Sequence, residues 1–383
     1  MMGLLSSFFA LHLALSLGTR SESIDEKPKS PKIKILSVFA EPERPSPDRR
    51  SAHLYGFELA LGEHPELKEK IEILDISLPR PLSEAASVAQ NAIQTHKPDV
   101  IIGGSTSNHA FVLGELADQN QIPFVTPWAT HPDVTRRSSH TFRTCFNDHY
   151  QATKLVDFIM DEKSLRSGLI LTNEKESFSV GFSQIFENRF KEKSGKKLHR
   201  ISYRNENELT TEDFKKLEAS KIEFVVIPTY EVEAAAIVSK LGSALSKGVQ
   251  FFGPDSWGEG RIINSVLQSL PNPPQAYVVS HWSADSSHPS NQKFLNQLQA
   301  KNFQFNERIS LASIAMSFDA LQVVLNAIRA SDNKSKSSIL SALKNTDVLI
   351  SRGRLQIKER QPESLPLFIN EMTQQGPKFV RAF

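Results

Sequence analysis

The chain has 383 residues, which is enough for two domains with sizeable cores. Hydrophobic residues make up 39% of it and charged residues 23%, a composition typical of a soluble globular protein. The 45 Lys and Arg residues almost match the 43 Asp and Glu residues, so the formal charge of +2 predicts no basic face and no nucleic-acid partner. The single cysteine, Cys145, excludes a disulfide framework within the chain.

The N-terminus predicts export from the cytoplasm. Residues 4–17 (LLSSFFALHLALSL) are mostly apolar but too few to cross a bilayer comfortably. Ser16 and Gly18 are small residues that fit a cleavage site after Gly18, so we predict a signal peptide over 1–18 and a flexible mature N-terminus over 19–31. No Lys or Arg precedes the apolar run, which leaves a disordered or buried N-terminal helix as the alternative. Cys145 lies too deep in the chain to carry a lipid, so we expect a periplasmic protein that is not a lipoprotein.

Strands and helices alternate over the first half of the chain. Apolar runs predict strands at 32–40, 71–76, 100–102 and 122–125. Helical periodicity predicts helices at 52–61, 82–95, 108–116 and 147–161. A charged, proline-rich loop is expected over 41–50.

The same alternation restarts in the second half. Strands are predicted at 168–171, 198–203, 223–227, 249–252 and 276–280, with helices at 181–192, 211–219 and 231–245. Three further helices follow at 291–300, 309–330 and 335–344, and then short strand-like pieces at 354–357, 367–369 and 379–380. This order predicts an α/β protein with two separate βαβ sheets.

Two polar turns of the first half follow adjacent predicted strands. Ser107 comes after the glycines that end the strand at 100–102, and Thr130 follows the strand at 122–125. Ligands of open parallel sheets bind at the carboxyl ends of the strands, so both hydroxyls are expected at one edge, where they suit a carboxylate. Ser107 is also predicted to be the N-cap of a helix that starts at Asn108, and a helix N-terminus receives anions.

The turns of the second half offer an acidic side chain, which suits a positively charged group. Asp255 follows a strand expected to be buried, so its carboxylate requires a partner, either a ligand ammonium or a neighbouring backbone turn. Four aromatic residues could wall the space beside it: Trp128, Phe178, Tyr230 and Trp257.

Motifs of enzymes are absent from the sequence. There is no GxxxxGK(S/T), HExxH or CxxC, and Ser107 lacks the flanking glycines of a nucleophile elbow. We therefore predict no catalytic residue, no cofactor and no metal site. One alternative stays open, a serine hydrolase on Ser107, because His109, His131 and His149 lie near the same edge.

Several segments, taken in order, resemble one family. These are GGSTSN, IPFVTPWAT and TFRTC within 103–144, then PTYEVEAAAIVSKLG, FFGPDSWG, ASIAMSFDALQVVLNAI, RGRLQI and GPKFV. Together they resemble the type I periplasmic binding proteins of the leucine/isoleucine/valine-binding family. The resemblance implies two Rossmann-like lobes with parallel sheets, joined by a hinge of three crossovers near 145–147, 279–280 and 350–366. Lobe I would comprise 32–146 and 280–352, and lobe II 147–279 and 353–383.

The resemblance also implies a ligand site between the lobes. A ligand carboxylate would be held by Ser107, by the backbone of Trp128 and by Thr130, and its ammonium by Tyr230 and Asp255. Phe178 would be an aromatic wall. Trp128 stands where the family usually carries a small residue, so its indole is expected to reshape the pocket. The preferred side chain stays open, and amides, urea or small carboxylates are alternatives to an amino acid.

The function implied is that of an extracytoplasmic solute-binding protein without enzymatic activity. It would be a monomer that captures its ligand by hinge closure and delivers it to the permease of an ABC importer. Three alternatives remain: a ligand-sensing receptor subunit, a relative whose pocket Trp128 blocks, and the hydrolase on Ser107.

Overall fold

The structure of the protein, a computed structural model, describes residues 31–40, 47–210, 212, 221–244, 248–303, 310–373 and 375–383. Residues 32–383 form one compact unit. Several predictions lie outside the described residues: the signal peptide over 1–18, nearly all of the N-terminal segment 19–31, the first part of the 41–50 loop, and the helix at 211–219 except for Glu212.

The first sheet is parallel and belongs to lobe I. Its strand order is β2-β1-β3-β4-β5, with β1 at Ile33–Ala40, β2 at Ile71–Leu78, β3 at Val100–Gly103, β4 at Phe124–Thr126 and β5 at Thr141–Arg143. The helices between these strands are α1 (Pro47–Gly62), α2 (Pro65–Lys68), α3 (Leu82–His96), α4 (Ser107–Asn120) and α5 (Asp133–Arg136). The four predicted strands are confirmed, and the apolar runs of β3 and β4 are fully buried, as expected for inner strands of a parallel sheet covered on both faces, whereas the edge strand β2 is only partly buried.

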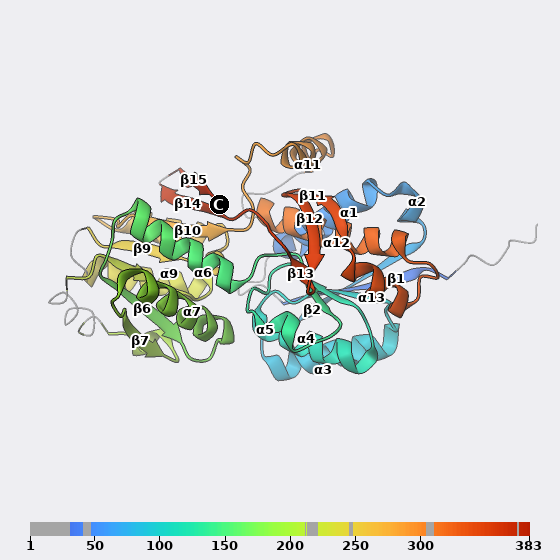
Figure 1. Ribbon diagram of the computed structural model, residues 1–383, viewed down its shortest axis with the longest axis horizontal. Coiled ribbons are helices and arrows are strands. Elements are labelled where there is room, and N and C mark those ends of the chain that lie inside the picture. The colour runs from blue at the N-terminus through green and yellow to red at the C-terminus, as the bar shows by residue number, and fades with distance from the viewer. Residues whose placement is uncertain are drawn as a thin grey trace, which may run out of the picture. The chain divides into compact units, whose positions relative to one another are not determined.

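The second sheet belongs to lobe II and has the order β15-β14-β10-β9-β8-β6-β7 (Figure 1). Its parallel strands are β6 (Gly168–Asn173), β7 (His199–Tyr203), β8 (Phe224–Val226), β9 (Gln250–Gly253) and β10 (Ala276–Ser280). The helices of this lobe include α6 (Asp148–Asp157), α7 (Ser177–Ser194), α9 (Glu231–Ala244) and α10 (Arg261–Ser269). The sheet is not wholly parallel, because β14 (Phe368–Thr373) pairs antiparallel with β10 and β15 (Gly376–Ala382) antiparallel with β14.

Helix α12 (Leu311–Ala330) returns the chain to lobe I, between α11 (Pro289–Ala300) and α13 (Lys336–Lys344). It is long and apolar enough to cross a membrane by length and composition, yet 83% of its apolar window is buried inside the protein. It packs closely on α1 at Gly56, where an added Cβ would lie 2.4 Å from the Ile314 carbonyl oxygen. Helix α12 is therefore the core helix of lobe I.

A small antiparallel sheet follows α13. It consists of β11 (Asp347–Ile350), β12 (Gly353–Lys358) and β13 (Gln361–Pro362). Strand β12 contacts α11 and α13, β11 contacts α12, and β13 contacts β5. The sequence assigns all of 353–383 to lobe II. We propose instead that lobe I continues to Pro362, because β12 and β13 pack on elements of that lobe.

Within the described residues the chain passes between the two lobes three times, after β5, after β10 and after β13. A buried ion pair lies beside the first of these passages. The Arg352 guanidinium lies 2.7 Å from the Asp319 carboxylate of α12 and also donates to the Thr144 carbonyl at 2.6 Å. Burial raises the pKa of Asp319, and the charge of Arg352 opposes that rise. The pair therefore ties the start of the first crossover to α12 in the core of lobe I.

Candidate ligand-binding site

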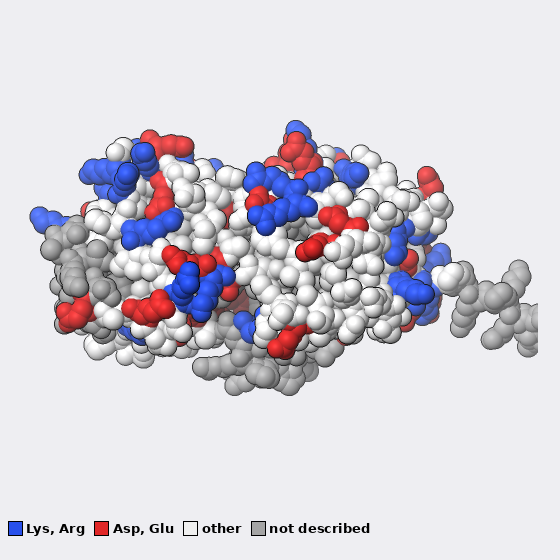
Figure 2. Space-filling model, turned by 90° about the horizontal axis from the view of Figure 1, so that it is seen from below, with Lys and Arg blue, Asp and Glu red and all other residues white. Residues whose placement is uncertain are grey.

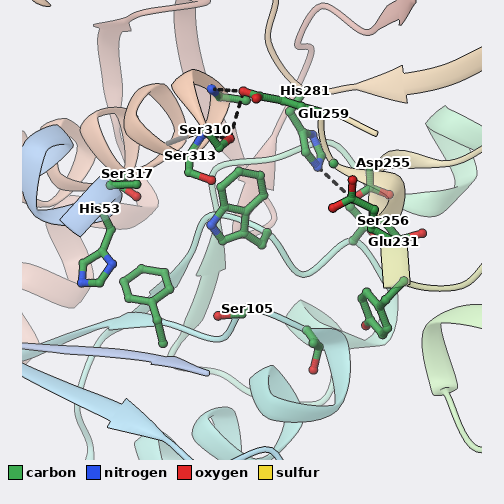
Figure 3. A pocket seen from close by; sticks show the side chains of 18 of the residues that line it. His53, Ser105, Glu231, Asp255, Ser256, Glu259, His281, Ser310, Ser313 and Ser317 are labelled. Carbon is green, nitrogen blue, oxygen red and sulfur yellow. Dashed lines mark hydrogen bonds and ion pairs between the residues drawn. The ribbon is translucent and has the colours of Figure 1, made fainter. Parts of the chain in front are cut away.

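A cavity of about 320 Å³ lies where the carboxyl ends of the strands of both sheets meet (Figure 3). This volume is within the range of small-molecule sites. The structure brings all six residues predicted from the sequence to its wall: Ser107, Trp128, Thr130, Phe178, Tyr230 and Asp255. Ser107, Trp128 and Thr130 come from lobe I, and the other three come from lobe II.

The two hydroxyl-bearing turns of lobe I meet as predicted. The Ser107 Oγ accepts a hydrogen bond from the His131 backbone nitrogen at 3.4 Å, which joins the turn after β3 to the turn after β4. Ser107 is not the N-cap of α4, however. Thr106 is, because its Oγ1 accepts from the His109 backbone nitrogen at 3.2 Å, and Ser107 is the first helical residue. Ser107 thus faces the cavity one position inside the helix.

Arg143 fixes the shape of the second turn. It lies buried at the end of β5 and donates to the carbonyls of four consecutive turn residues, Ala129, Thr130, His131 and Pro132, at 3.1, 2.8, 2.8 and 3.2 Å. Burial lowers the pKa of Arg143. Sequence reasoning missed both this residue and β5, because a three-residue strand that ends in arginine carries no apolar run.

Asp255 lies at the lobe II side of the cavity and is already hydrogen-bonded within the protein. Its Oδ1 accepts from Gln151 Nε2 at 2.7 Å, and its Oδ2 lies 3.0 Å from His281 Nε2 (Figure 3). Its side chain is only 8% exposed. A carboxylate offers about four acceptor positions. Asp255 therefore keeps the capacity to accept from a ligand in the cavity.

Gln151 also reaches a second carboxylate, that of Asp148. Its Nε2 donates to Asp148 Oδ1 at 2.7 Å, so one amide bridges two acids. Both residues lie on one face of α6, which begins after the N-cap Asn147. Burial raises the pKa of Asp148 to about 7, and the charge of Asp255 adds to the rise. Burial likewise lowers the pKa of His281, and the hydrogen bond to Asp255 opposes this.

The aromatic residues divide between wall and core. Phe178 and Tyr230 pack together with ring centroids 6.0 Å apart, and burial raises the pKa of Tyr230. The Trp128 ring lies edge-on to the His281 ring, with ring centroids 5.9 Å apart, and it lines the cavity without filling it. Trp257 is not a wall residue: its indole is fully buried in lobe II and donates to the Ile227 carbonyl at 2.9 Å.

The opposite wall was not predicted from the sequence. It is formed by Phe39 of β1, His53 of α1 and Asp75 of β2. Asp75 Oδ1 lies 2.9 Å from His53 Nε2 and accepts from Ser37 Oγ at 2.8 Å. His53 stacks on Phe39 with ring centroids 4.6 Å apart. One signal for this wall was available in the sequence. Phe39 and Asp75 lie in β1 and β2, which run parallel to β3, so the carboxyl ends of all three strands lie at the same edge of the sheet.

Comparison with known proteins identifies the family. Residues 53–364 match the family model described as periplasmic binding protein. The chain belongs to this family. Relatives include the Leu/Ile/Val-binding protein homolog 3 of Brucella melitensis, 27% identical over 88 residues, which are 23% of this chain and 24% of the relative. Another is the Leu/Ile/Val-binding protein BraC3 of Rhizobium johnstonii, 29% identical over 89 residues, again 23% and 24%. The chain thus matches about a quarter of the length of these relatives.

Solved structures match far more of the chain and confirm the type I binding-protein fold. The leucine-binding protein LivK of Thermotoga maritima has a TM-score of 0.80 at 22% identity, covering 92% of this chain and 98% of that one. LivJ of Streptococcus pneumoniae, in complex with isoleucine, has a TM-score of 0.74 at 21% identity, covering 91% and 99%. A solute-binding protein of Rhodopseudomonas palustris in complex with p-hydroxybenzoic acid has a TM-score of 0.75 at 15% identity, covering 92% and 97%.

The proteins matched are binding proteins and not enzymes, and the hydrogen bonds at Ser107 agree with this. A hydrolase would need a histidine side chain bonded to the Ser107 hydroxyl. The His109 ring instead bonds to Thr106 and to the Pro79 carbonyl, and the His131 ring accepts from the Asp133 backbone. In the part of the chain that the structure describes, no cluster of three or more His, Cys, Asp or Glu residues could hold a metal ion.

Polar contacts join the lobes of this binding protein beside the cavity. Asn108 of α4 donates to Glu176 at 2.9 Å and is also hydrogen-bonded to Ser177 of α7. Glu259 of lobe II accepts from Ser310 Oγ and from the Ala312 backbone nitrogen, both at 3.0 Å, at the N-terminus of α12 (Figure 3). These contacts join lobe I to lobe II directly beside the cavity.

Proposed function

We propose that this protein captures a small amino acid, or a related amide or carboxylate, between its lobes and delivers it to an ABC importer. One observation carries the proposal. Neutral hydroxyls from lobe I and a carboxylate from lobe II line the same cavity. Ser107, Thr130 and the Trp128 backbone would receive the ligand carboxylate. Tyr230 and Asp255 would receive its ammonium, and Phe178 would cover the apolar portion.

The mechanism follows from the division of these residues between the lobes. A ligand that contacts only lobe I leaves its ammonium exposed, whereas closure adds Asp255, Tyr230 and the interlobe contacts of Asn108 and Glu259. Because the ligand interacts more favourably with the closed state, it shifts the population toward closure. No bond of the ligand is made or broken.

The wider context is part of the same proposal. A signal peptide over 1–18 would direct the protein to the periplasm. There the mature protein would act as a monomer and deliver its ligand to the permease of its importer. The surface supports a small-molecule ligand over nucleic acid, because acidic and basic side chains are interspersed on the face seen in Figure 2. The relatives support it too: the Streptococcus pneumoniae protein holds isoleucine and the Rhodopseudomonas palustris protein an aromatic acid.

Thermal-shift and calorimetric screening against free amino acids, small amides and carboxylates tests the proposal. A ligand present at 100 times its dissociation constant should stabilise the protein by about 2.7 kcal/mol. Asp255→Ala should abolish this gain for any ligand that carries an ammonium, whereas Asp285→Ala, which removes an exposed carboxylate, should leave it unchanged. Equal affinity in the Asp255 variant would refute the assigned role, and no stabilisation by the whole panel would refute the function.

A further inference from the structure

The end of the cavity farthest from Asp255 carries polar side chains beside the aromatic ring of Phe39. His53 of α1 and Ser317 of α12 lie on the opposite side of the pocket from Asp255 and Ser256 (Figure 3). In a site for leucine or isoleucine, this end would surround the hydrocarbon side chain and should be apolar, because buried polar groups without partners cost free energy. The chemistry of this end therefore bears on which ligand fits.

Close packing of two helices brings these side chains together. Gly56 allows α12 to approach α1, and a Cβ built on it would lie 3.0 Å from Ser317 Cβ. His53 lies one turn before Gly56, on the same face of α1. Ser313, one turn before Ser317 on α12, lines the same cavity. The packing thus places an imidazole and two hydroxyls at one end of the pocket.

The Ser317 hydroxyl is the least satisfied group there. The residue is 1% exposed, and its Oγ has no hydrogen-bond partner among the described residues. His53 is also buried and is oriented by Asp75, which lies 2.9 Å from its Nε2. Buried hydroxyls of native proteins are nearly always hydrogen-bonded, so an orphaned one on a cavity wall indicates a partner inside the cavity.

We propose that this end of the cavity is a subsite for a neutral hydrogen-bonding group on the ligand side chain, a hydroxyl or a carboxamide. The inference rests on the proposed function and narrows its substrate class. An aliphatic side chain would leave the Ser317 hydroxyl unpaired and would bury Asp75 and His53 against hydrocarbon. A neutral polar group supplies the hydrogen-bond partner that the Ser317 hydroxyl lacks. It also brings no charge next to the acidic Asp75, which already has His53 as its partner, or next to the basic Arg80, which lines the same cavity.

Calorimetry with near-isosteric amino-acid pairs tests the subsite: valine with threonine, leucine with asparagine, and phenylalanine with tyrosine. In at least one pair the polar member should bind at least about tenfold tighter, since a site built to hydrogen-bond a group strongly rejects the analogue that lacks it. Ser317→Ala should weaken the polar member more than the apolar one and reduce the ratio by about tenfold. Without ligand, this variant should unfold at the same temperature as the wild type or higher, because it removes an unpaired polar atom.

Ser341→Ala is the matched control, because it removes an exposed hydroxyl from α13 and should leave every affinity unchanged. Tighter or equal binding of the apolar member in all pairs would overturn the subsite while leaving the proposed function intact. A ratio unchanged by Ser317→Ala would also overturn it, because water and not the ligand would then satisfy the hydroxyl. If no member of any pair binds, the subsite and the capture of amino acids both fail.

Discussion

Replacing Asp148 by asparagine should change how the stability of the protein depends on pH. Asp148 is fully buried in the first turn of α6, where one carboxylate oxygen accepts a hydrogen bond from Gln151. Burial, with the nearby charge of Asp255, raises its pKa from 3.8 to about 7. Asparagine has nearly the same shape and cannot ionise, so the substitution removes the contribution of this side chain to the pH dependence of stability.

The sign follows from the two states. In the unfolded chain Asp148 loses its proton near pH 3.8, whereas in the folded protein it keeps the proton up to about pH 7. Between these values the folded state binds the extra proton, so the contribution of Asp148 to stability falls as the pH rises. The full loss, 7 − 3.8 pH units at 1.36 kcal/mol each, is roughly 4 kcal/mol. About 3 kcal/mol of it falls between pH 5 and pH 8.

Urea denaturation of both proteins at pH 5, 6, 7 and 8, without ligand, measures this difference. The unfolding free energy of Asp148→Asn minus that of the wild type should grow by about 3 kcal/mol over this range. His131, whose pKa burial lowers to about 4, contributes a slope of opposite sign, but it is present in both proteins and cancels in the difference. A difference that stays constant with pH would show that Asp148 ionises normally and would refute the argument. Asp285→Asn, at an exposed carboxylate, should give the flat difference.

Three other substitutions probe the supports of the site. Arg143→Lys should weaken ligand binding and cost about 2–4 kcal/mol in urea denaturation, because one ammonium cannot serve four carbonyls; unchanged affinity would contradict its role in holding the turn. Arg352→Met should cost about 3–5 kcal/mol by leaving Asp319 buried without its cation, and a smaller loss after adding Asp319→Leu would verify this cause. Glu259→Gln should weaken ligand binding by up to about tenfold, since a neutral amide accepts more weakly at the positive end of α12; a change in stability without a change in affinity would argue against an interlobe role.

The sequence was sufficient for the elements that carry strong patterns. The central strands of both sheets are apolar runs bounded by glycine or proline, and their positions were predicted within a few residues. Ser107, Thr130 and Asp255 follow such strands directly, and parallel strands bring their carboxyl ends to one edge of the sheet. Hence Ser107 and Thr130 reach the cavity together from the first sheet, and Asp255 reaches it from the second.

Local ambiguity explains the smaller errors. Thr106 and Ser107 are both small hydroxyl residues, and only the backbone geometry decides which of them caps α4. Trp257 follows a strand just as Asp255 does, but it turns into the core, where its indole packs against Gly253. Strand β12 alternates regularly between buried and exposed residues, which predicts a strand, but the lobe on which β12 and β13 pack is decided by tertiary contacts with α11, α13 and β5.

Some of the residues missed altogether line the cavity, as His53 and Asp75 do, and others support the groups that face it. A carboxylate as buried as Asp255 is costly unless donors surround it, and its donors, Gln151 and His281, come from α6 and from the residue after β10. The turn that carries Thr130 likewise depends on a guanidinium from β5. Such partners are chosen by three-dimensional proximity and require no fixed spacing in the chain. A pattern can therefore place those cavity groups that directly follow strong strands, whereas their orientation and proton affinity depend on buried neighbours that only the folded structure reveals.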